Sequence, residues 1–191
     1  MTPLFEIFIH SLVLCSIPGP INILSALFGK KKGLSNSLGF IAGASLGFSC
    51  LVITVGTGLV KAIDDYPQLI NLLKYVGGLY IIFISVCMVF LDEEELTGCI
   101  KCKFFDGFFI QWINVKSWIW ALFVASSFSN IRGPLIIFAS IEFIVEFICL
   151  ILWAYAGEQI AKIWSSPRQQ KIFDTILAIS LATIAILILA G

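Results

Sequence analysis

Pro18-Gly19-Pro20-Ile21-Asn22 interrupts an apolar run that extends from Leu4 to Phe28. Two prolines remove two backbone donors and glycine loosens the chain, so a membrane helix should open at this point. Backbone groups without partners are tolerated within a bilayer only where they face protein or a watery cavity. The stretch therefore predicts a membrane helix that is broken at a cavity, and broken helices of this kind commonly line substrate paths.

The composition places the rest of the chain in lipid as well. Hydrophobic residues make up 59% of the 191 residues, charged residues 13%, and the net charge is zero, while the mean hydropathy is +1.01. These values exclude a soluble domain. Helices of about 20 residues cross a hydrocarbon core of roughly 30 Å. The predicted fold is an all-α membrane protein with six transmembrane helices, near residues 4–29, 37–60, 67–91, 107–129, 134–157 and 172–190.

Basic residues determine the predicted orientation. Only Lys61 and Arg132 lie in the loops after the second and fourth stretches, whereas eight basic residues follow the first, third and fifth. Because loops rich in lysine and arginine stay in the cytoplasm, both termini are predicted to lie outside. The eight residues are Lys30, Lys31, Lys32, Lys101, Lys103, Lys162, Arg168 and Lys171.

A second interruption, Asn114-Val115-Lys116, lies about half a chain length after the first, again within an apolar run. We interpret residues 1–191 as one membrane domain that contains two repeats, 1–91 and 107–191, joined by a polar linker at 92–106. Three spans in each repeat is an odd number, so the two repeats must be inverted relative to one another. The breaks in the first and fourth helices would then reach a similar depth from opposite directions.

Four segments, in order, resemble the LysE/RhtB amino-acid exporters: Pro18-Gly19-Pro20 with a following asparagine, Gly39 to Gly47, Leu73 to Tyr80, and Asn114 to Lys116. The similarity covers nearly the whole chain. The cysteine/O-acetylserine branch of the family fits more closely, and it accommodates the two departures from the commoner pattern, Ile21 in place of asparagine and Val115 in place of proline. The resemblance implies a secondary transporter, not an enzyme, that exports small amino acids across the bacterial inner membrane in exchange for protons.

The two breaks therefore carry the predicted substrate site. Asn22 and Asn114 are expected to offer amide hydrogen bonds, and Lys116 either holds a substrate carboxylate or pairs with Glu146. Pro18, Gly19 and Pro20 would hold the first break open and expose a half-helix end to the charged groups of an amino acid.

Glu142 and Glu146 are the predicted proton-coupling residues. They are four residues apart and share one helical face, and Glu146 is expected at the depth of Lys116. Charges near the bilayer centre cost roughly 2.5 to 3.5 kcal/mol each, so they normally find partners. Either the two carboxylates relay protons, or one neutralises Lys116 and the other meets a polar neighbour.

The predicted partners are an amino-acid substrate, protons and the lipid bilayer, with no nucleic acid, metal or cofactor; a homo-oligomer is left open.

Gly39, Gly43 and Gly47 recur every four residues, which predicts close packing of one helix face against another helix.

Two other function classes compete with export. A membrane thiol-disulfide relay needs a reactive cysteine in each half, yet only Cys15 lies beside a break, with no cysteine between Asp106 and Asn130. A divalent-cation exporter would need more membrane carboxylates or histidines than the two glutamates. Cys99-Ile-Lys-Cys102 is a CxxC pair without further zinc ligands nearby, and its role is left open.

Overall fold

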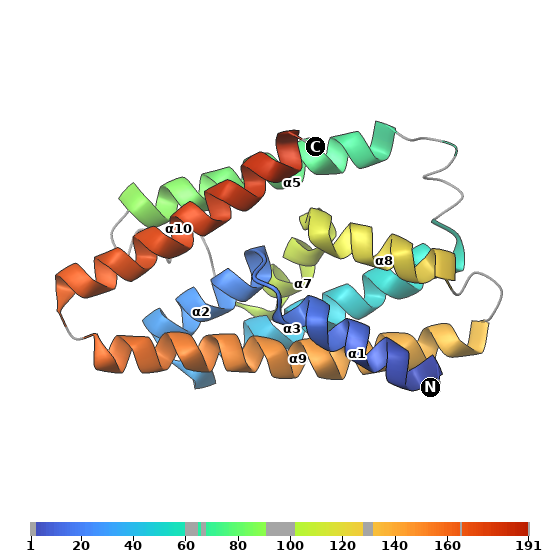
Figure 1. Cartoon of the computed structure of the whole chain (residues 1–191), viewed down its shortest axis with the longest axis horizontal. Helices are drawn as coiled ribbons and strands as arrows, with labels where there is room; N and C mark the ends of the chain where they lie inside the picture. Colours follow the sequence, from blue (N-terminus) through green and yellow to red (C-terminus); the bar gives the residue numbers. More distant parts are fainter. Residues whose placement is uncertain are drawn as a thin grey trace.

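The computed structural model describes residues 3–59, 65, 68–90, 102–127, 132–164 and 166–190, and the regular structure in these ranges is helical throughout (Figure 1). In chain order the elements are α1 (Pro3–Ser16), α2 (Pro20–Lys32), α3 (Leu34–Thr54) with a π-helical turn η1 (Val55–Leu59), α5 (Gln68–Phe90), α7 (Phe104–Ile113), α8 (Val115–Ser127), α9 (Arg132–Ile163) and α10 (Pro167–Ala190). The all-helical class predicted from the sequence is confirmed for these residues.

Four of the described helices are long and apolar enough to cross a membrane, judged by length and composition. They are Leu34–Gly58, Asn71–Phe90, Leu135–Ile163 and Pro167–Ala190. The two remaining predicted spans, near 4–29 and 107–129, are each divided into two shorter helices, so neither half alone has the length of a span.

Both predicted helix breaks are present. The first separates α1 from α2, and Gly19 caps the start of α2 with an extended backbone, φ −148° and ψ 175°, followed by Pro20 at the first helical position. The second lies at Asn114, whose φ of −82° and ψ of 105° end α7 before α8 begins. In Figure 1, α1 and α2 run away from the N-terminus at the right, whereas α7 and α8 run back toward that side.

The long helices extend past the apolar stretches that predicted them. α9 continues to Ile163 rather than to residue 157, because charged residues do not interrupt helical hydrogen bonding, and Lys162 and Glu158 form an i, i+4 ion pair of 2.7 Å there. α10 begins at Pro167 rather than at residue 172, because proline suits the first position of a helix.

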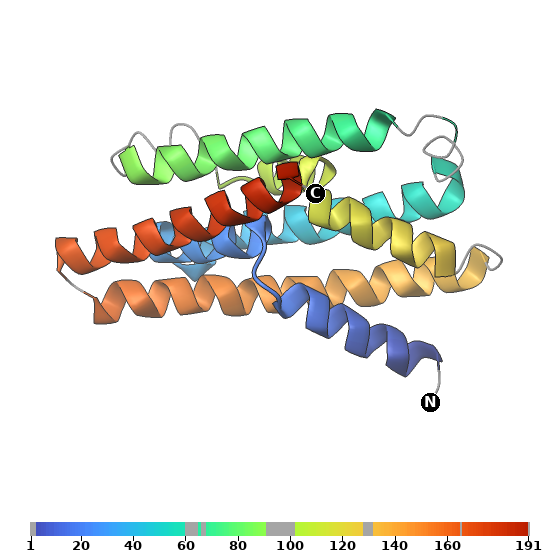
Figure 2. The ribbon, with the colours of Figure 1, turned by 45° about the horizontal axis from the view of Figure 1, so that its top comes forward.

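Each broken helix packs against the second helix of the other half of the chain. α1 and α2 contact α9, while α7 and α8 contact α3, and α3 crosses α9. Figures 1 and 2 both show α5 and α10 side by side, and these two helices are in contact. One buried apolar cluster lies between α2, α3, α5, α7, α9 and α10, and a second lies between α3, α8 and α9.

Glycines bring α3 and α7 into contact backbone to backbone. A Cβ at Gly43 would lie 1.8 Å from the carbonyl oxygen of Phe104, and one at Gly107 would lie 2.1 Å from that of Phe40. A Cβ at Gly39, by contrast, would meet nothing closer than 3.9 Å. The predicted packing role is therefore confirmed for Gly43, where no larger residue fits.

Glycines also bring α2 and α9 into contact backbone to backbone. A Cβ at Gly29 would lie 1.9 Å from the carbonyl oxygen of Ala154, and one at Gly157 would lie 1.9 Å from that of Ala26. The glycines are reciprocal, one on each helix, so neither helix can carry a side chain at this contact.

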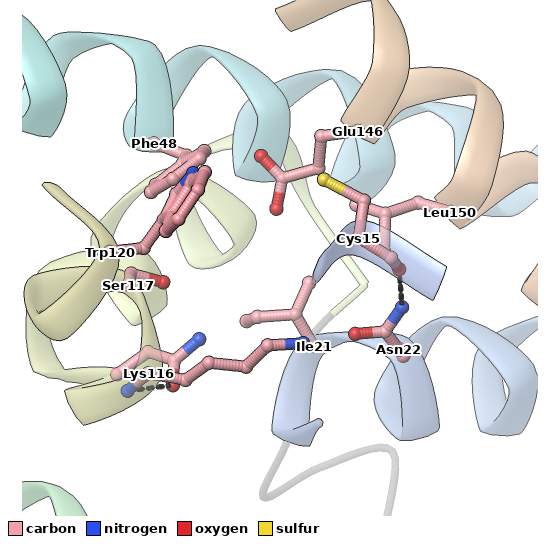
Figure 3. Close-up of a pocket in the computed structure, with 10 residues that line it drawn as sticks. Cys15, Ile21, Asn22, Phe48, Lys116, Ser117, Trp120, Glu146 and Leu150 are labelled. Atoms are coloured by element: carbon pink, nitrogen blue, oxygen red, sulfur yellow. Dashed lines mark hydrogen bonds between the residues drawn. The ribbon is translucent and has the colours of Figure 1, made fainter. Parts of the chain in front are cut away.

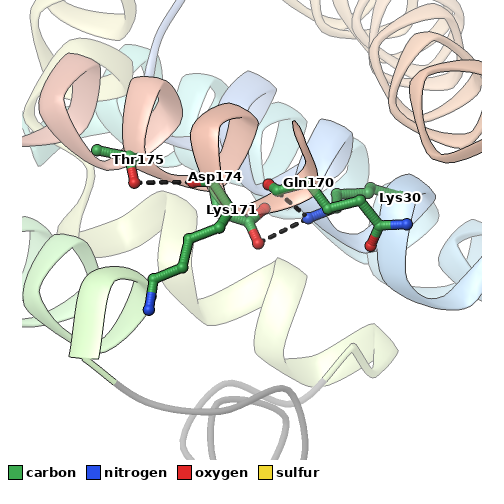
Figure 4. Close-up of polar contacts among 5 residues, drawn as sticks. All are labelled: Lys30, Gln170, Lys171, Asp174 and Thr175. Carbon is green, nitrogen blue, oxygen red and sulfur yellow. Dashed lines mark hydrogen bonds and ion pairs between the residues drawn. The ribbon is translucent and has the colours of Figure 1, made fainter. Parts of the chain in front are cut away.

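Polar contacts fasten the end of the bundle where α2 ends and α10 begins. Lys30 Nζ lies 2.6 Å from Asp174 Oδ2 and donates to the carbonyl oxygen of Gln170 at 3.1 Å (Figure 4). Nearby, the backbone N–H of Leu34 at the start of α3 donates to Glu158 Oε2 at 2.9 Å. The half-helix α2 is thus tied to α10, and α3 is tied to α9.

Candidate functional site

The two helix breaks meet through Lys116, at the start of α8. Its Nζ donates a hydrogen bond of 2.8 Å to the carbonyl oxygen of Ile17, in the break between α1 and α2. The lysine stem lies over Gly19, where a Cβ would be 3.0 Å from Lys116 Cδ and 3.2 Å from Nζ. Glycine at this position therefore leaves room for the lysine to reach the end of α1.

Asn22 closes the first break from the other side. Its Nδ2 donates to the carbonyl oxygen of Cys15 at 2.7 Å. The last carbonyls of a helix lack intrahelical donors, so this side chain supplies one of the missing bonds. Asn22 thus has a structural role that its predicted role in substrate binding did not include.

Asn114 shapes the second break in the same way. Its Oδ1 accepts the backbone N–H of Lys116 at 3.2 Å, and its backbone carbonyl accepts that of Ser117 at 2.9 Å, so Asn114 caps α8. Trp118 Nε1 donates to the carbonyl oxygen of Trp112 at 2.6 Å, near the end of α7. Side chains thereby replace hydrogen bonds that the interrupted helix has lost.

Glu142 is fully buried and surrounded by donors. Its Oε1 accepts from Ser11 Oγ and from Trp120 Nε1, the latter at 3.1 Å, and its Oε2 lies 3.8 Å from the thiol of Cys15. Three helices, α1, α8 and α9, converge on this carboxyl group. Glu142 therefore has the polar neighbours that one expectation required, and its predicted part in proton coupling stays a prediction.

Glu146, one turn further along α9, is held at one oxygen only. Its Oε1 accepts from Gln111 Nε2 at 2.6 Å, whereas Oε2 is buried without a hydrogen-bond partner among the described residues. Gln111 in turn accepts at its Oε1 from Asn114 Nδ2 at 3.3 Å and from Ser117 Oγ at 2.5 Å. One polar network therefore runs from the second break to the carboxyl group of Glu146.

A pocket lies between the breaks and α9, with a volume of about 410 Å³ that includes the part open to the outside (Figure 3). Polar and apolar side chains share its wall. Lining residues are Cys15, Ile21, Asn22, Phe48, Asn114, Lys116, Ser117, Trp120, Glu146 and Leu150.

Four of the predicted site residues line this pocket, namely Asn22, Asn114, Lys116 and Glu146. The lysine and glutamate thus share the pocket, and their direct pairing stays a prediction. The other predicted residues are not among those that line it: Pro18 is exposed, Gly19 and Pro20 are buried, and Glu142 is buried one turn from Glu146.

Sequence reasoning missed Gln111, Trp120 and Ser11 as parts of the site. Gln111 had a usable signal, because it is an amide in an apolar run and lies three residues before Asn114, on the same helical face. Trp120 and Ser11 had none, since both residue types are common in membrane helices and only the fold brings them to Glu142.

No group of three histidine, cysteine or carboxylate side chains in the described ranges could hold a metal ion. Cys99 of the CxxC pair lies outside those ranges, and the Cys102 thiol lies 3.7 Å from the carbonyl oxygen of Asn36. The pair therefore has no assigned role.

The model of the LysE type translocator family matches residues 12–191. The chain belongs to this family. Curated relatives of this LysE-type chain include proteins named cysteine/O-acetylserine efflux protein. The protein from Escherichia coli (strain K12) is 26% identical over 198 residues, and the alignment covers 97% of this chain and 98% of the Escherichia coli protein. The one from Salmonella typhimurium is 29% identical over 132 residues, covering 67% of each chain. No solved structure matches the chain.

Proposed function

We propose that this LysE-type translocator exports small amino acids or their derivatives, of the cysteine and O-acetylserine kind, from the bacterial cytoplasm in exchange for protons. The carrying observation is that a basic residue, Lys116, and an acidic residue, Glu146, line one pocket at the meeting point of two broken helices. An amino acid is a zwitterion, so it matches a site with one group of each charge. The names of the relatives supply the substrate class.

The two ends of the substrate have separate attachment points in this proposal. Lys116 lies beside the start of α2, where backbone N–H groups without intrahelical partners favour an anion, so the carboxylate binds there. The ammonium group binds Glu146, whose buried Oε2 has no partner among the described residues. Apolar neighbours such as Ile21 and Leu150 line the same pocket and would contact a short side chain of the substrate.

The arrangement of helices supports six spans in two inverted halves. The broken helices run in opposite directions, and each packs against the second helix of the other half. The second helices of the two halves, α3 and α9, are in contact, and so are the third helices, α5 and α10. A two-fold axis between the halves would exchange the two members of each pair. This pattern is what inverted repeats in transporters produce around a central site.

Charge supports an orientation with both termini outside. The lysines at the end of α2, Lys162 near the end of α9, and Arg168 and Lys171 at the start of α10 lie at helix ends that meet at one end of the bundle. Basic residues concentrate on the cytoplasmic side of membrane proteins. Family membership favours transport over the thiol relay and over cation export.

Counterflow in proteoliposomes tests the proposal. Vesicles loaded with one unlabelled amino acid should take up the labelled compound, and a panel that includes cysteine, O-acetylserine, alanine, lysine and leucine should show preference for the small ones. Lys116→Met should lower counterflow at least tenfold, because it removes the cation that holds the carboxylate. Lys171→Met is the matched control, since Lys171 is exposed at the basic end, and it should exchange at the wild-type rate. Absence of counterflow for every amino acid in wild-type vesicles would refute the proposal.

A further inference from the structure

The hydrogen-bond network at the second break has a fixed direction. The backbone N–H of Lys116 can only donate, so the atom of Asn114 that it contacts at 3.2 Å must be the amide oxygen. The amide nitrogen of Asn114 then faces Gln111 at 3.3 Å, and it too can only donate. Gln111 must therefore present its oxygen toward Asn114.

The same reasoning continues to Glu146. With its oxygen engaged by Asn114 and by Ser117, Gln111 directs its Nε2 toward Glu146 Oε1 at 2.6 Å. Because Nε2 donates, Oε1 of the glutamate must accept and cannot carry a proton along that bond. A proton on Glu146 is therefore placed on Oε2.

Oε2 is also the oxygen of Glu146 that no described group occupies, so it is the one left for a ligand. It is buried, it has no hydrogen-bond partner among the described residues, and Glu146 lines the pocket. Figure 3 shows the carboxyl group of Glu146 directed into the space bordered by Trp120, Ile21 and Cys15. A buried polar atom left without a partner costs about 1–3 kcal/mol, which favours a state in which something binds there.

We propose that a proton and the ammonium group of the substrate compete for Glu146 Oε2, and that Gln111 is the positioning residue that keeps Oε1 out of this competition. The inference rests on the proposed function, because it takes an amino acid as the substrate. A protonated Oε2 is neutral and presents a donor, which an ammonium group, also a donor, cannot use. The pocket therefore holds a proton or a substrate, and this alternation is what one-for-one exchange requires.

Other charged and titratable groups around Glu146 have different tasks. Glu142, on the same helix, already engages Ser11, Trp120 and Cys15, so it lacks an oxygen free of partners and stabilises the junction of α1, α8 and α9. Lys116 lines the pocket from α8 and Cys15 from α1, and the proposal places the exchanged proton on neither of them. The competition is thus confined to one oxygen.

Calorimetric titration of the purified full chain in detergent tests the competition, with O-acetyl-L-serine as the probe between pH 5 and pH 7. Measurements in two buffers of different ionisation enthalpy give the number of protons released per substrate bound. On the acidic side of this range, we expect each bound substrate to release up to one proton. The Kd for the substrate should rise up to about tenfold for each unit by which the pH falls. Glu146→Gln, which has nearly the same shape, should bind with a pH-independent Kd and release no proton.

Variants around the network separate positioning from a structural role. Gln111→Met frees Oε1, so a proton and a substrate can occupy different oxygens, and the pH slope of Kd should fall to less than half. Ser117→Ala weakens the hold on Gln111 and should reduce the slope less, which provides a milder variant if Gln111→Met fails to fold. Gln68→Met, at the exposed start of α5, should keep the wild-type slope.

The possible results separate the competition at Glu146, the positioning role of Gln111 and the proposed function. A wild-type Kd that does not change with pH, or a Glu146→Gln variant that still releases a proton, overturns the competition while leaving amino-acid transport intact. An unchanged slope in Gln111→Met overturns the positioning role. If no amino acid binds the wild-type chain at all, the proposed function fails and this inference fails with it.

Discussion

Lys30 allows the anchoring of the half-helix α2 to be measured. Its side chain is only 1% exposed and that of Asp174 is 15% exposed, and the two charged atoms are 2.6 Å apart. The ammonium group also donates to the carbonyl oxygen of Gln170 at 3.1 Å and lies 5.9 Å from the centre of the Phe173 ring. Asp174 Oδ1 has no hydrogen-bond partner among the described residues, so the lysine is the main support of the carboxylate.

Lys30→Met should therefore be strongly destabilising. Removing one partner of a buried ion pair costs about 3–5 kcal/mol, because the remaining charge is left uncompensated in a poorly hydrated site. Asp174→Asn should cost less, about 1.5–3 kcal/mol for a lost charge-assisted hydrogen bond, since Lys30 keeps the Gln170 carbonyl. The double variant Lys30→Met with Asp174→Leu should recover most of the loss, because apolar residues of similar volume often replace a buried pair at little cost.

The assay is reversible unfolding in mixed detergent micelles, with helicity followed by circular dichroism as the fraction of denaturing detergent rises. Lys162→Met is the control, because Lys162 is 60% exposed in its pair with Glu158 and should lose no more than about 1 kcal/mol. Equal losses in Lys30→Met and Lys162→Met, or a double variant that is no more stable than Lys30→Met alone, would refute the reasoning.

Two further predictions concern the breaks and the helix contacts. Gly107→Ala places a Cβ 2.1 Å from the carbonyl oxygen of Phe40, so it should force α3 and α7 apart and lower the yield of folded protein on gel filtration, whereas Gly39→Ala, with 3.9 Å of space, should match wild type. Asn22→Ala leaves the Cys15 carbonyl without its donor at 2.7 Å, which should cost about 1–3 kcal/mol in unfolding and also reduce counterflow. A variant with reduced stability and full counterflow would restrict Asn22 to its capping role.

The sequence predicted the positions of both breaks because proline, glycine and asparagine act on the backbone locally. Gly19, Pro20 and Asn114 disfavour a continuous helix at their own positions, whatever the rest of the chain packs against. How the breaks are closed was not predictable, since Asn22 caps a carbonyl seven residues earlier and Lys116 reaches a carbonyl in the other half of the chain. Such bonds depend on how two helices approach each other, which residue type alone does not determine.

The carboxylates show a second limit of sequence reasoning. Their i, i+4 spacing predicted one shared face, yet Glu142 and Glu146 differ in what they contact. The difference arises because Trp120 and Ser11 reach the first, while Gln111 holds a single oxygen of the second. Equal spacing therefore did not predict equal chemistry, and the separation of their roles required the packing of α1 and α8 against α9.

The reciprocal glycine contact between α2 and α9 has a consequence for biosynthesis. α2 leaves the ribosome long before α9 is made, and until α9 is inserted the face of α2 that carries Gly29 lacks the surface it was shaped to fit. The nascent first half should therefore be vulnerable to membrane proteases during that interval. A gene divided between the codons for Phe90 and Cys102 should yield a stable first fragment only when the second is produced in the same cell.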